Sequence, residues 1–343
     1  MGFDWDDWDF DWNDWDFDID ILLGLQQFRN GIGEVFADFL AQMTWLAESK
    51  TVLVIMAVIY WGCSKRFGSF LLLGWNANRL VNGFLKITVC AYRPWIRDAR
   101  IVPYGHSIRT ATGYSFPSGH STNAASVYGG GMLWKSFPGI LRILMAVIVI
   151  LVPFSRLYLG VHTPQDVLCG TAFSLLTMWL VLKLLRWLET HPGKDWIVPG
   201  IGIILSIALA AYAGFKPYPA DYDAKGKLLV NGMTMARDTF KCVGWCSGFL
   251  IAWILERRLV GFSTDIPGVV KATRIAAGML GYYILNLIFI PLLRNGLGPG
   301  TFAVAASFLQ MFYIVFFFPF IFSVFEKWQK RRIENSNTVS AGN

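Results

Sequence analysis

The 343-residue chain carries little charge: 15% of its residues are Asp, Glu, Lys or Arg, whereas 55% are hydrophobic. A chain of this composition cannot bury its apolar surface in a water-soluble core, which excludes an ordinary soluble domain. Apolar runs of about 20 residues recur instead, and each is long enough to cross the hydrocarbon core of a bilayer. The sequence therefore predicts an all-α, polytopic helix bundle that is integral to a membrane.

Cysteine is scarce and its count is odd. The five cysteines lie in or beside apolar segments and are Cys63, Cys90, Cys169, Cys242 and Cys246. This placement argues against a disulfide framework and suits small buried hydrophobic side chains. No cluster of acidic residues with the spacing of a metal site lies near the polar motifs of residues 86–166, so we expect neither a metal nor another cofactor.

The N-terminus lacks the positive region and the small-residue cleavage site of a signal peptide. Residues 3–23 instead form three heptads rich in Asp, Trp and Phe. The tryptophans recur every three or four positions, which is typical of a stripe on one side of a helix. Three interpretations stay open: a solvated acidic tail, an interfacial helix anchored by indole rings, and a tail that binds a basic partner.

The formal net charge of +7 does not indicate a nucleic-acid partner, because the Lys and Arg residues fall in short loops between apolar runs. Cationic loops suit a protein that faces anionic lipid headgroups and binds phosphate. We therefore expect the membrane bilayer as a partner and no nucleic acid, and the sequence leaves the oligomeric state open.

Three short polar motifs stand out from this apolar background, in a fixed order. They are Lys86 with Arg93-Pro94, then Pro117-Ser118-Gly119-His120, then Ser155-Arg156 with His162 and Asp166. Each motif alone is compatible with an ordinary helix start, since a serine can cap a helix and a proline suits its first position. Together they place three cations, two histidines and an aspartate at the ends of apolar segments, where ionisable groups are costly and usually functional.

These residue types match the needs of phosphate ester chemistry. Arginine offers a phosphate a planar fork of donors, lysine offers a point charge, and N–H groups at a helix start favour anions. His162 is the predicted nucleophile, Asp166 the carboxylate that orients its ring, and His120 the proton donor. The predicted phosphate-binding residues are Lys86, Arg93, Arg156, Ser118 and Gly119.

The connection over residues 91–118 carries further basic side chains. They form a candidate vestibule for an anionic substrate and are Arg97, Arg100, Arg109 and His106. For His106, a plain solvated loop histidine is the alternative interpretation.

In these motifs the sequence resembles the type 2 phosphatidic acid phosphatase superfamily. The pattern of that family is K-x6-R-P, P-S-G-H and S-R-x5-H-x3-D, and the sequence matches it at every fixed position. These proteins are integral-membrane lipid phosphate phosphatases, and the resemblance covers about residues 21–190. It implies a six-helix core, a phosphorylated lipid substrate, and metal-independent hydrolysis of a lipid phosphate or diphosphate through a phosphohistidine. The segments 24–30 and 111–116 most resemble the sphingosine-1-phosphate-phosphatase-like bacterial branch.

Polar breaks divide the chain into four predicted parts. They are an acidic and aromatic tail (1–20), the phosphatase core (21–190), about four additional transmembrane helices (191–326), and a basic and polar tail (327–343). The amphipathic segment 21–46 either spans the membrane or lies in its interface, and 51–63 is predicted as the next span. The turn-rich stretch 216–227 is predicted to be a plain connector, with a lid as the alternative.

Loop charges favour an extracytoplasmic site, and we expect the membrane to be a bacterial plasma membrane. If the N-terminus is inside and 21–46 spans, the cytoplasmic loops hold fifteen Lys and Arg residues, against ten outside once the motif cations are set aside. Two other functions stay open: a lipid phosphotransferase that uses the same phosphohistidine and, from another class, a non-catalytic lipid-binding or transport protein.

Overall fold

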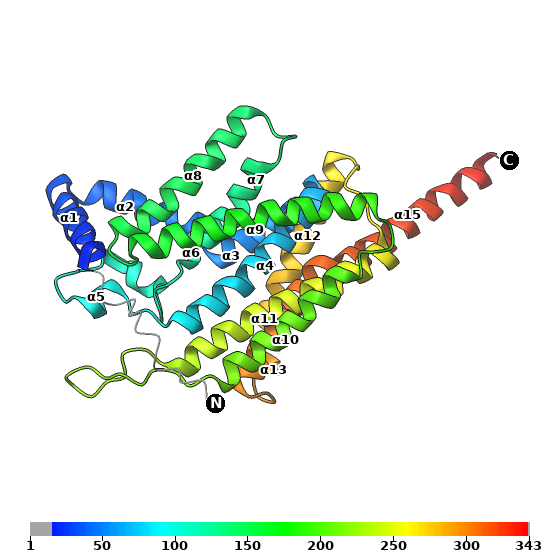
Figure 1. Cartoon of the computed structure of the whole chain (residues 1–343). Coiled ribbons are helices and arrows are strands. Elements are labelled where there is room, and N and C mark those ends of the chain that lie inside the picture. The colour runs from blue at the N-terminus through cyan, green and yellow to red at the C-terminus, as the bar shows by residue number, and fades with distance from the viewer. Residues whose placement is uncertain (1–15, 342–343) are drawn as a thin grey trace. The chain divides into compact units, whose positions relative to one another are not determined.

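The computed structural model of the chain describes residues 16–341, which are almost entirely helical (Figure 1). In the first part of the chain the helices are α1 (Asp16–Ile32), α2 (Glu34–Met43), α3 (Ser49–Val58), α4 (Lys65–Val89), α5 (Pro94–Arg97), α6 (Gly119–Ala124), α7 (Gly130–Leu133), α8 (Gly139–Tyr158) and α9 (Pro164–Thr190). They are followed by α10 (Ile197–Phe215), α11 (Gly232–Leu255), α12 (Gly268–Ile284), α13 (Ile290–Leu293), α14 (Pro299–Phe312) and α15 (Phe318–Ala341).

Short 3-10 and π-helical turns connect or extend several of these helices. The 3-10 turns of the described residues are η2 (Thr44–Ala47) and η4 (Gly105–Thr110). The π-helical turns are η3 (Ile59–Cys63), η5 (Ala125–Gly129), η6 (Glu256–Val260), η7 (Leu285–Phe289) and η8 (Tyr313–Phe317). The described part of the chain has no strand, only an isolated bridge between Tyr222 and Leu228, so the all-α fold class is confirmed.

Within residues 16–341, six helical segments are long and apolar enough to cross a membrane. They are Gly139–Tyr158, Pro164–Thr190, Ile197–Phe215, Gly232–Val260, Gly268–Leu293 and Pro299–Gln329. Four of the six lie after residue 190, as predicted. α4 is also 25 residues long but carries Asn76, Asn78, Arg79 and Asn82, and it is not among the six. The protein is therefore a multi-pass membrane protein.

The amphipathic segment 21–46 is not the single helix that the sequence predicted. α1 ends at Ile32, and Gly33 adopts φ 95°, a left-handed conformation that glycine accepts without steric strain. α2 and η2 then form, with α3 and η3, a pair of helices bent by 53° that together are long enough for one span. This broken segment joins the second part of 21–46, for which a spanning helix and an interfacial helix were both open, to the span predicted over 51–63.

Helices extend into both segments that were predicted as tails. The heptads up to residue 15 lie outside the described residues, but residues 16–20 of the predicted tail are already part of α1. At the other end, α15 continues to Ala341 through the segment predicted to be a polar tail. The predicted domain boundaries themselves stay predictions.

The described chain clusters into two compact units. The first unit contains the described part of residues 1–49, together with 82–175 and 216–235, and it holds all three motifs. The second unit contains residues 50–81, 176–215 and the described part of 236–343. The connection from α10 to α11 therefore groups with the motifs, although it follows them by 50 residues or more in the chain.

In the first unit, the N-terminal helices pack on the end of α8 that leads into the third motif. Ala37 and Leu40 of α2 form a buried cluster with Tyr158. Arg29 of α1 donates from Nη1 to the carbonyl of Tyr158 at 3.0 Å and from Nη2 to that of Val102 at 2.8 Å. Since the last carbonyls of a helix have no partner within it, Arg29 completes the end of α8.

In the second unit, π-helical turns expose carbonyls that other helices use. The indole of Trp61 donates to the carbonyl of Ile314 at 2.7 Å, and the Tyr60 hydroxyl to that of Val315 at 3.3 Å. Both acceptors lie in η8. In a membrane protein every backbone polar group needs a partner within the protein, so these bonds join η3 to η8.

Candidate active site

The first motif begins at the C-terminal end of α4. Lys86 donates from Nζ to the carbonyl of Tyr114 at 3.0 Å and to that of Pro117 at 3.1 Å. These acceptors lead into the second motif. These two hydrogen bonds fix the position of the ammonium group, so Lys86 joins the first two motifs.

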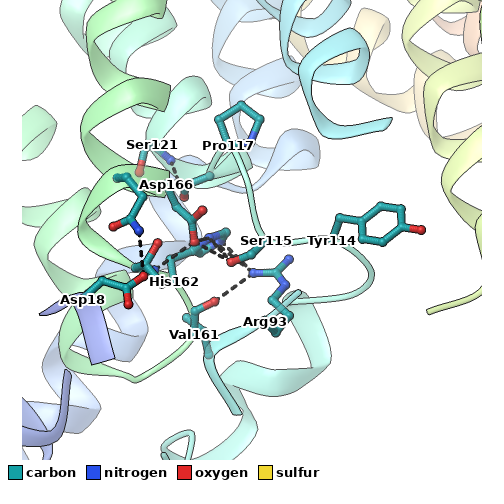
Figure 2. A network of polar contacts seen from close by, with 12 residues as sticks. Asp18, Arg93, Tyr114, Ser115, Pro117, Ser121, Val161, His162 and Asp166 are labelled. Carbon is teal, nitrogen blue, oxygen red and sulfur yellow. Dashed lines mark hydrogen bonds and ion pairs between the residues drawn. The ribbon is translucent and has the colours of Figure 1, made fainter. Parts of the chain in front are cut away.

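Arg93 contacts both Val161 and His162 of the third motif (Figure 2). Its side chain is buried, with Nε bound to the carbonyl of Gly113 at 3.0 Å, Nη2 to that of Thr112 at 3.1 Å and Nη1 to that of Val161 at 2.9 Å. Burial lowers the pKa of Arg93 to about 10. The guanidinium therefore keeps its charge at neutral pH and connects the loop before the second motif to the third.

The second motif forms a capped helix start, as predicted. The Ser118 hydroxyl accepts a hydrogen bond from the N–H of Ser121 at 3.4 Å, and Gly119 and His120 are the first two residues of α6. The backbone N–H of Ser118 donates to the carbonyl of Asp166 at 2.9 Å. The start of α6, with its half-buried histidine, therefore lies beside the start of α9.

The third motif supplies a buried histidine–carboxylate pair. His162 Nδ1 lies 3.1 Å from Asp166 Oδ2, and both side chains are 2% exposed. The same carboxylate oxygen accepts from the N–H of Thr163 at 2.8 Å and from the Ser115 hydroxyl. Asp166 is therefore fixed by three donors, and it orients the imidazole ring.

Ser115 is a site residue that the sequence analysis missed. Its hydroxyl contacts both Asp166 and, at 3.5 Å, His162 Nδ1 (Figure 2). The residue stands two positions before the second motif, inside the segment 111–116 that carried the finer resemblance. That proximity is the only signal in the sequence, because a serine in a loop has many uses.

The electrostatics of the site favour a neutral His162. Burial, reinforced by the charges of Arg93, Arg156 and Lys86, holds the pKa of His162 well below its ordinary value. A neutral ring that donates from Nδ1 to Asp166 leaves a lone pair on Nε2, and this atom lies 2.9 Å from Arg93 Nη1. The structure thus brings together the predicted nucleophile, its orienting carboxylate and the three cations.

Arg156 differs from Arg93 in its partners. Its side chain is fully buried in the last turn of α8, and its one hydrogen bond to the described residues is a long one, from Nη2 to Thr110 Oγ1 at 3.5 Å. Nε and Nη1 are buried and have no hydrogen-bond partner there. Buried donors left unsatisfied are costly and require an explanation. An anion such as a phosphate group would satisfy them.

The vestibule predicted from four basic residues is divided in the structure. Arg97 is nearly buried and forms a two-point ion pair with Asp18 of α1, at 2.6 and 3.0 Å. Gln165, between the two catalytic candidates of the third motif, also donates to Asp18, at 2.7 Å. The charge of Arg97 is therefore already paired.

The other vestibule residues lie at the surface. Arg100 is exposed and pairs with Asp98 at 2.6 Å, while His106 and Arg109 belong to the exposed part of η4. No group of three or more metal-ligating side chains occurs within residues 16–341.

This fold and this site describe a helical membrane protein with a buried, cation-lined histidine, and comparison with known proteins gives its family. Residues 67–189 match the PAP2 superfamily, and residues 240–331 match the transmembrane extension of PAP2 superfamily phosphatases. The chain is 34% identical over 160 residues to phosphatidylglycerophosphatase B of Bacillus subtilis, covering 42% of this chain and 72% of that protein. It belongs to the PAP2 superfamily of phosphatases.

Two further relatives carry other substrate names. One is the lipid A 4'-phosphatase of Bacteroides thetaiotaomicron, 26% identical over 194 residues (53% of this chain, 85% of that protein). The other is an undecaprenyl-diphosphatase of Sulfolobus acidocaldarius, 36% identical over 87 residues (24% and 38%). None of the three is named as a sphingosine phosphatase, and the resemblance to that branch stays a prediction.

A solved structure is also similar. It is the crystal structure of a PAP2-type phosphatidylglycerolphosphate phosphatase from Bacillus subtilis, with 31% identity and a TM-score of 0.41, covering 49% of this chain and 84% of that one.

Proposed function

We propose that this chain hydrolyses a lipid phosphate or diphosphate through a phosphohistidine at His162, without a metal ion. The observation that carries the proposal is the pair of His162 and Asp166: it is buried, oriented and surrounded by three cations. The relatives are named for phosphatidylglycerophosphate, lipid A and undecaprenyl diphosphate. Their common feature is a phosphate on a lipid, and we propose that class as the substrate.

The proposed reaction has two steps. His162 Nε2 forms a bond to phosphorus while the bond from phosphorus to the lipid oxygen breaks, and His120 donates the proton that this oxygen needs. Water then attacks the phosphohistidine, gives its proton to His120, and releases inorganic phosphate and the free imidazole. Lys86, Arg93 and Arg156 stabilise the negative charge that develops on the equatorial oxygens.

Phosphate release from purified protein tests this function. A panel of phosphatidate, phosphatidylglycerophosphate and undecaprenyl diphosphate in EDTA should show turnover of at least one lipid. His162→Ala should be inactive on all of them, and His191→Ala, outside the motifs, should match the wild type. Transfer of phosphate to an added alcohol in place of water would identify a phosphotransferase instead. No turnover of any lipid would contradict the proposal.

Substrates with different leaving groups distinguish the roles proposed for His120 and His162. General acid catalysis contributes about 100- to 10,000-fold, so His120→Ala should lose that factor on an alkyl lipid phosphate. With p-nitrophenyl phosphate, whose leaving group needs little protonation, the phosphorylation step should survive. Phosphohistidine should then accumulate, and rapid quenching with mass spectrometry of the 155–170 peptide should detect it. Equal loss on both substrates, or phosphate on another residue, would contradict these roles.

We also propose that the site faces the extracytoplasmic side of a bacterial plasma membrane, on the excess of basic residues in the opposite loops. Ile108 is 46% exposed in η4, beside the site. In a background without Cys63, Ile108→Cys should react with a membrane-impermeant maleimide in intact cells. Lys135→Cys, in an opposite loop, should react only after permeabilisation. The reverse pattern would invert the topology.

A further inference from the structure

The connection from α10 to α11, residues 216–231, is an ordered loop of the first unit rather than a plain connector (Figure 1, yellow-green). Tyr222 and Leu228 form an isolated antiparallel bridge across it. The carboxylate of Asp223 accepts two backbone N–H groups within its turn, both at 2.9 Å. The loop therefore has a defined shape, and its contacts with the motifs can be assigned to single side chains.

The first contact is a cap on the helix that carries the first motif. Lys216 donates from Nζ to the carbonyl of Ile87 and, at 3.3 Å, to that of Thr88. These carbonyls belong to the last turn of α4, where no helical partner exists and a cation is favourable. Lys216 thus completes the helix end directly after Lys86.

The second contact holds the turn that follows. Cys90 adopts φ 55°, a left-handed conformation that is uncommon for a residue other than glycine. Its Sγ lies 3.2 Å from Lys216 Nζ. Two residues on, the Tyr92 hydroxyl donates to the carboxylate of Asp221. Burial, and then the bond to Asp221, raise the pKa of Tyr92 above its ordinary value, so the phenol stays protonated as the donor.

This turn determines how two cations of the site are spaced. It leads from Lys86, in α4, to Arg93, which directly precedes α5. Within the motif region, the N–H of Ser115 donates to the carbonyl of Ala91 at 2.8 Å, which holds the middle of the turn. The remaining side-chain contacts described above come from the α10–α11 loop.

We propose that Lys216 and Asp221 are positioning residues of the phosphate site, and that they hold the turn at residues 90–92 in the conformation that aims Lys86 and Arg93 at one phosphate group. The inference rests on the proposed function. Both cations must reach the same dianion, and a misplacement of about 1 Å can reduce a rate by about 100-fold. The segment that follows the phosphatase core thereby contributes to the core's own chemistry.

The main test measures turnover of the best lipid of the panel and inhibition by orthovanadate, with the full-length protein. Lys216→Met should lower kcat/KM and raise the inhibition constant of vanadate by roughly 10- to 100-fold. Lys216→Arg keeps a donor for the two carbonyls and should restore most of the loss. Lys225→Met and Lys227→Met remove exposed lysines of the same loop and should behave as the wild type.

A double-mutant cycle tests the second contact without removing a charge from the helix end. Tyr92→Phe and Asp221→Asn should each weaken vanadate binding a few-fold, and the double variant should be no worse than either single one, because one hydrogen bond is lost in each case. Tyr222→Phe, an exposed tyrosine of the same loop, is the matched control. Fully additive effects would overturn the role of Asp221.

The outcomes separate this inference from the proposed function. The positioning role is wrong if the wild type releases phosphate and needs His162, but the inhibition constant of vanadate is the same for Lys216→Met as for the control Lys225→Met. A fall in kcat with an unchanged vanadate constant would show a loss of folded protein only, and it would overturn the inference as well. Absence of turnover in the wild type would instead contradict the proposed function.

Discussion

Arg156 and Arg274 are both buried in the helical interior, one in each unit, yet their surroundings differ. Arg274 donates to the carbonyls of Trp61 at 3.1 Å and Ser263 at 2.9 Å, and pairs with Glu326 at 2.6 Å. Arg156 has a single long hydrogen bond within the described chain. Arg274 thus connects three segments of the second unit and, among the described residues, leaves one buried nitrogen, Nε, without a partner. Arg156 leaves two, Nε and Nη1, and these donors are suited to bind an anion.

The largest expected effect separates these two arginines. Arg156→Met should reduce kcat/KM by about 100- to 1,000-fold, the range for loss of one transition-state donor, with little change in unfolding temperature. Arg274→Met should leave the activity of the folded protein unchanged but lower its stability by about 3–5 kcal/mol, because Glu326 and two carbonyls lose their donor. Lipid phosphatase assays and thermal unfolding in detergent measure both.

A reversed result, with Arg274→Met inactive while folded or Arg156→Met fully active, would remove the distinction between the two arginines.

Asp18 extends the comparison, because it belongs to a buried ion pair, as Arg274 does, and contacts the site region, as Arg156 does. Its carboxylate is held in an ion pair, like that of Glu326 with Arg274 in the second unit, but its partners, Arg97 and Gln165, belong to the site region. Asp18→Asn should lower kcat/KM by roughly tenfold through movement of the first turn of α9, and it should also lower the unfolding temperature. Asp20→Asn, an exposed aspartate of the same helix, is the control and should change neither. Equal behaviour of the two variants would leave Asp18 without a role.

The smallest expected effect is a shift in pH dependence. Because burial and the neighbouring cations lower the pKa of His162, removing one cation should raise it. Arg93→Gln should therefore move the acid limb of kcat/KM to higher pH, in addition to its loss of rate. Lys135→Gln removes an exposed cation of another loop and should leave the limb unchanged. A limb that stays in place in Arg93→Gln would show that another group controls it.

The stability of the folded protein should also depend on pH through His162. His162 stays neutral in the folded protein, whereas in the unfolded chain it takes up a proton below its ordinary pKa of about 6.5. Unfolding then binds a proton, so stability should fall as the pH decreases below that value. His162→Gln should reduce this dependence, measured as unfolding temperature against pH.

The sequence by itself determined the fold class, the family and the site residues that the structure brings together. Long apolar runs with little charge predict membrane helices. The motif residues lie at the ends of helices, so their spacing in the sequence is enough to predict that they share a site. Sequence could not decide the helix breaks, because a glycine alone does not mark one: Gly24 and Gly31 lie within α1, whereas Gly33, at φ 95°, follows its end. It also could not show that α15 continues through the polar C-terminal residues.

Only the tertiary structure decided which polar residues act together. Arg97 looked like a free vestibule cation until α1 supplied Asp18, 79 residues earlier in the chain. Ser115 has only its proximity to the second motif as a signal, and Lys216 has none, since their roles depend on Asp166 and on the end of α4, which the fold brings to them. The spacing of residues in the sequence predicts which of them lie at the same helix end. Hydrogen bonds between distant segments cannot be predicted in this way, because they form only when the packed helices bring donor and acceptor within about 3 Å.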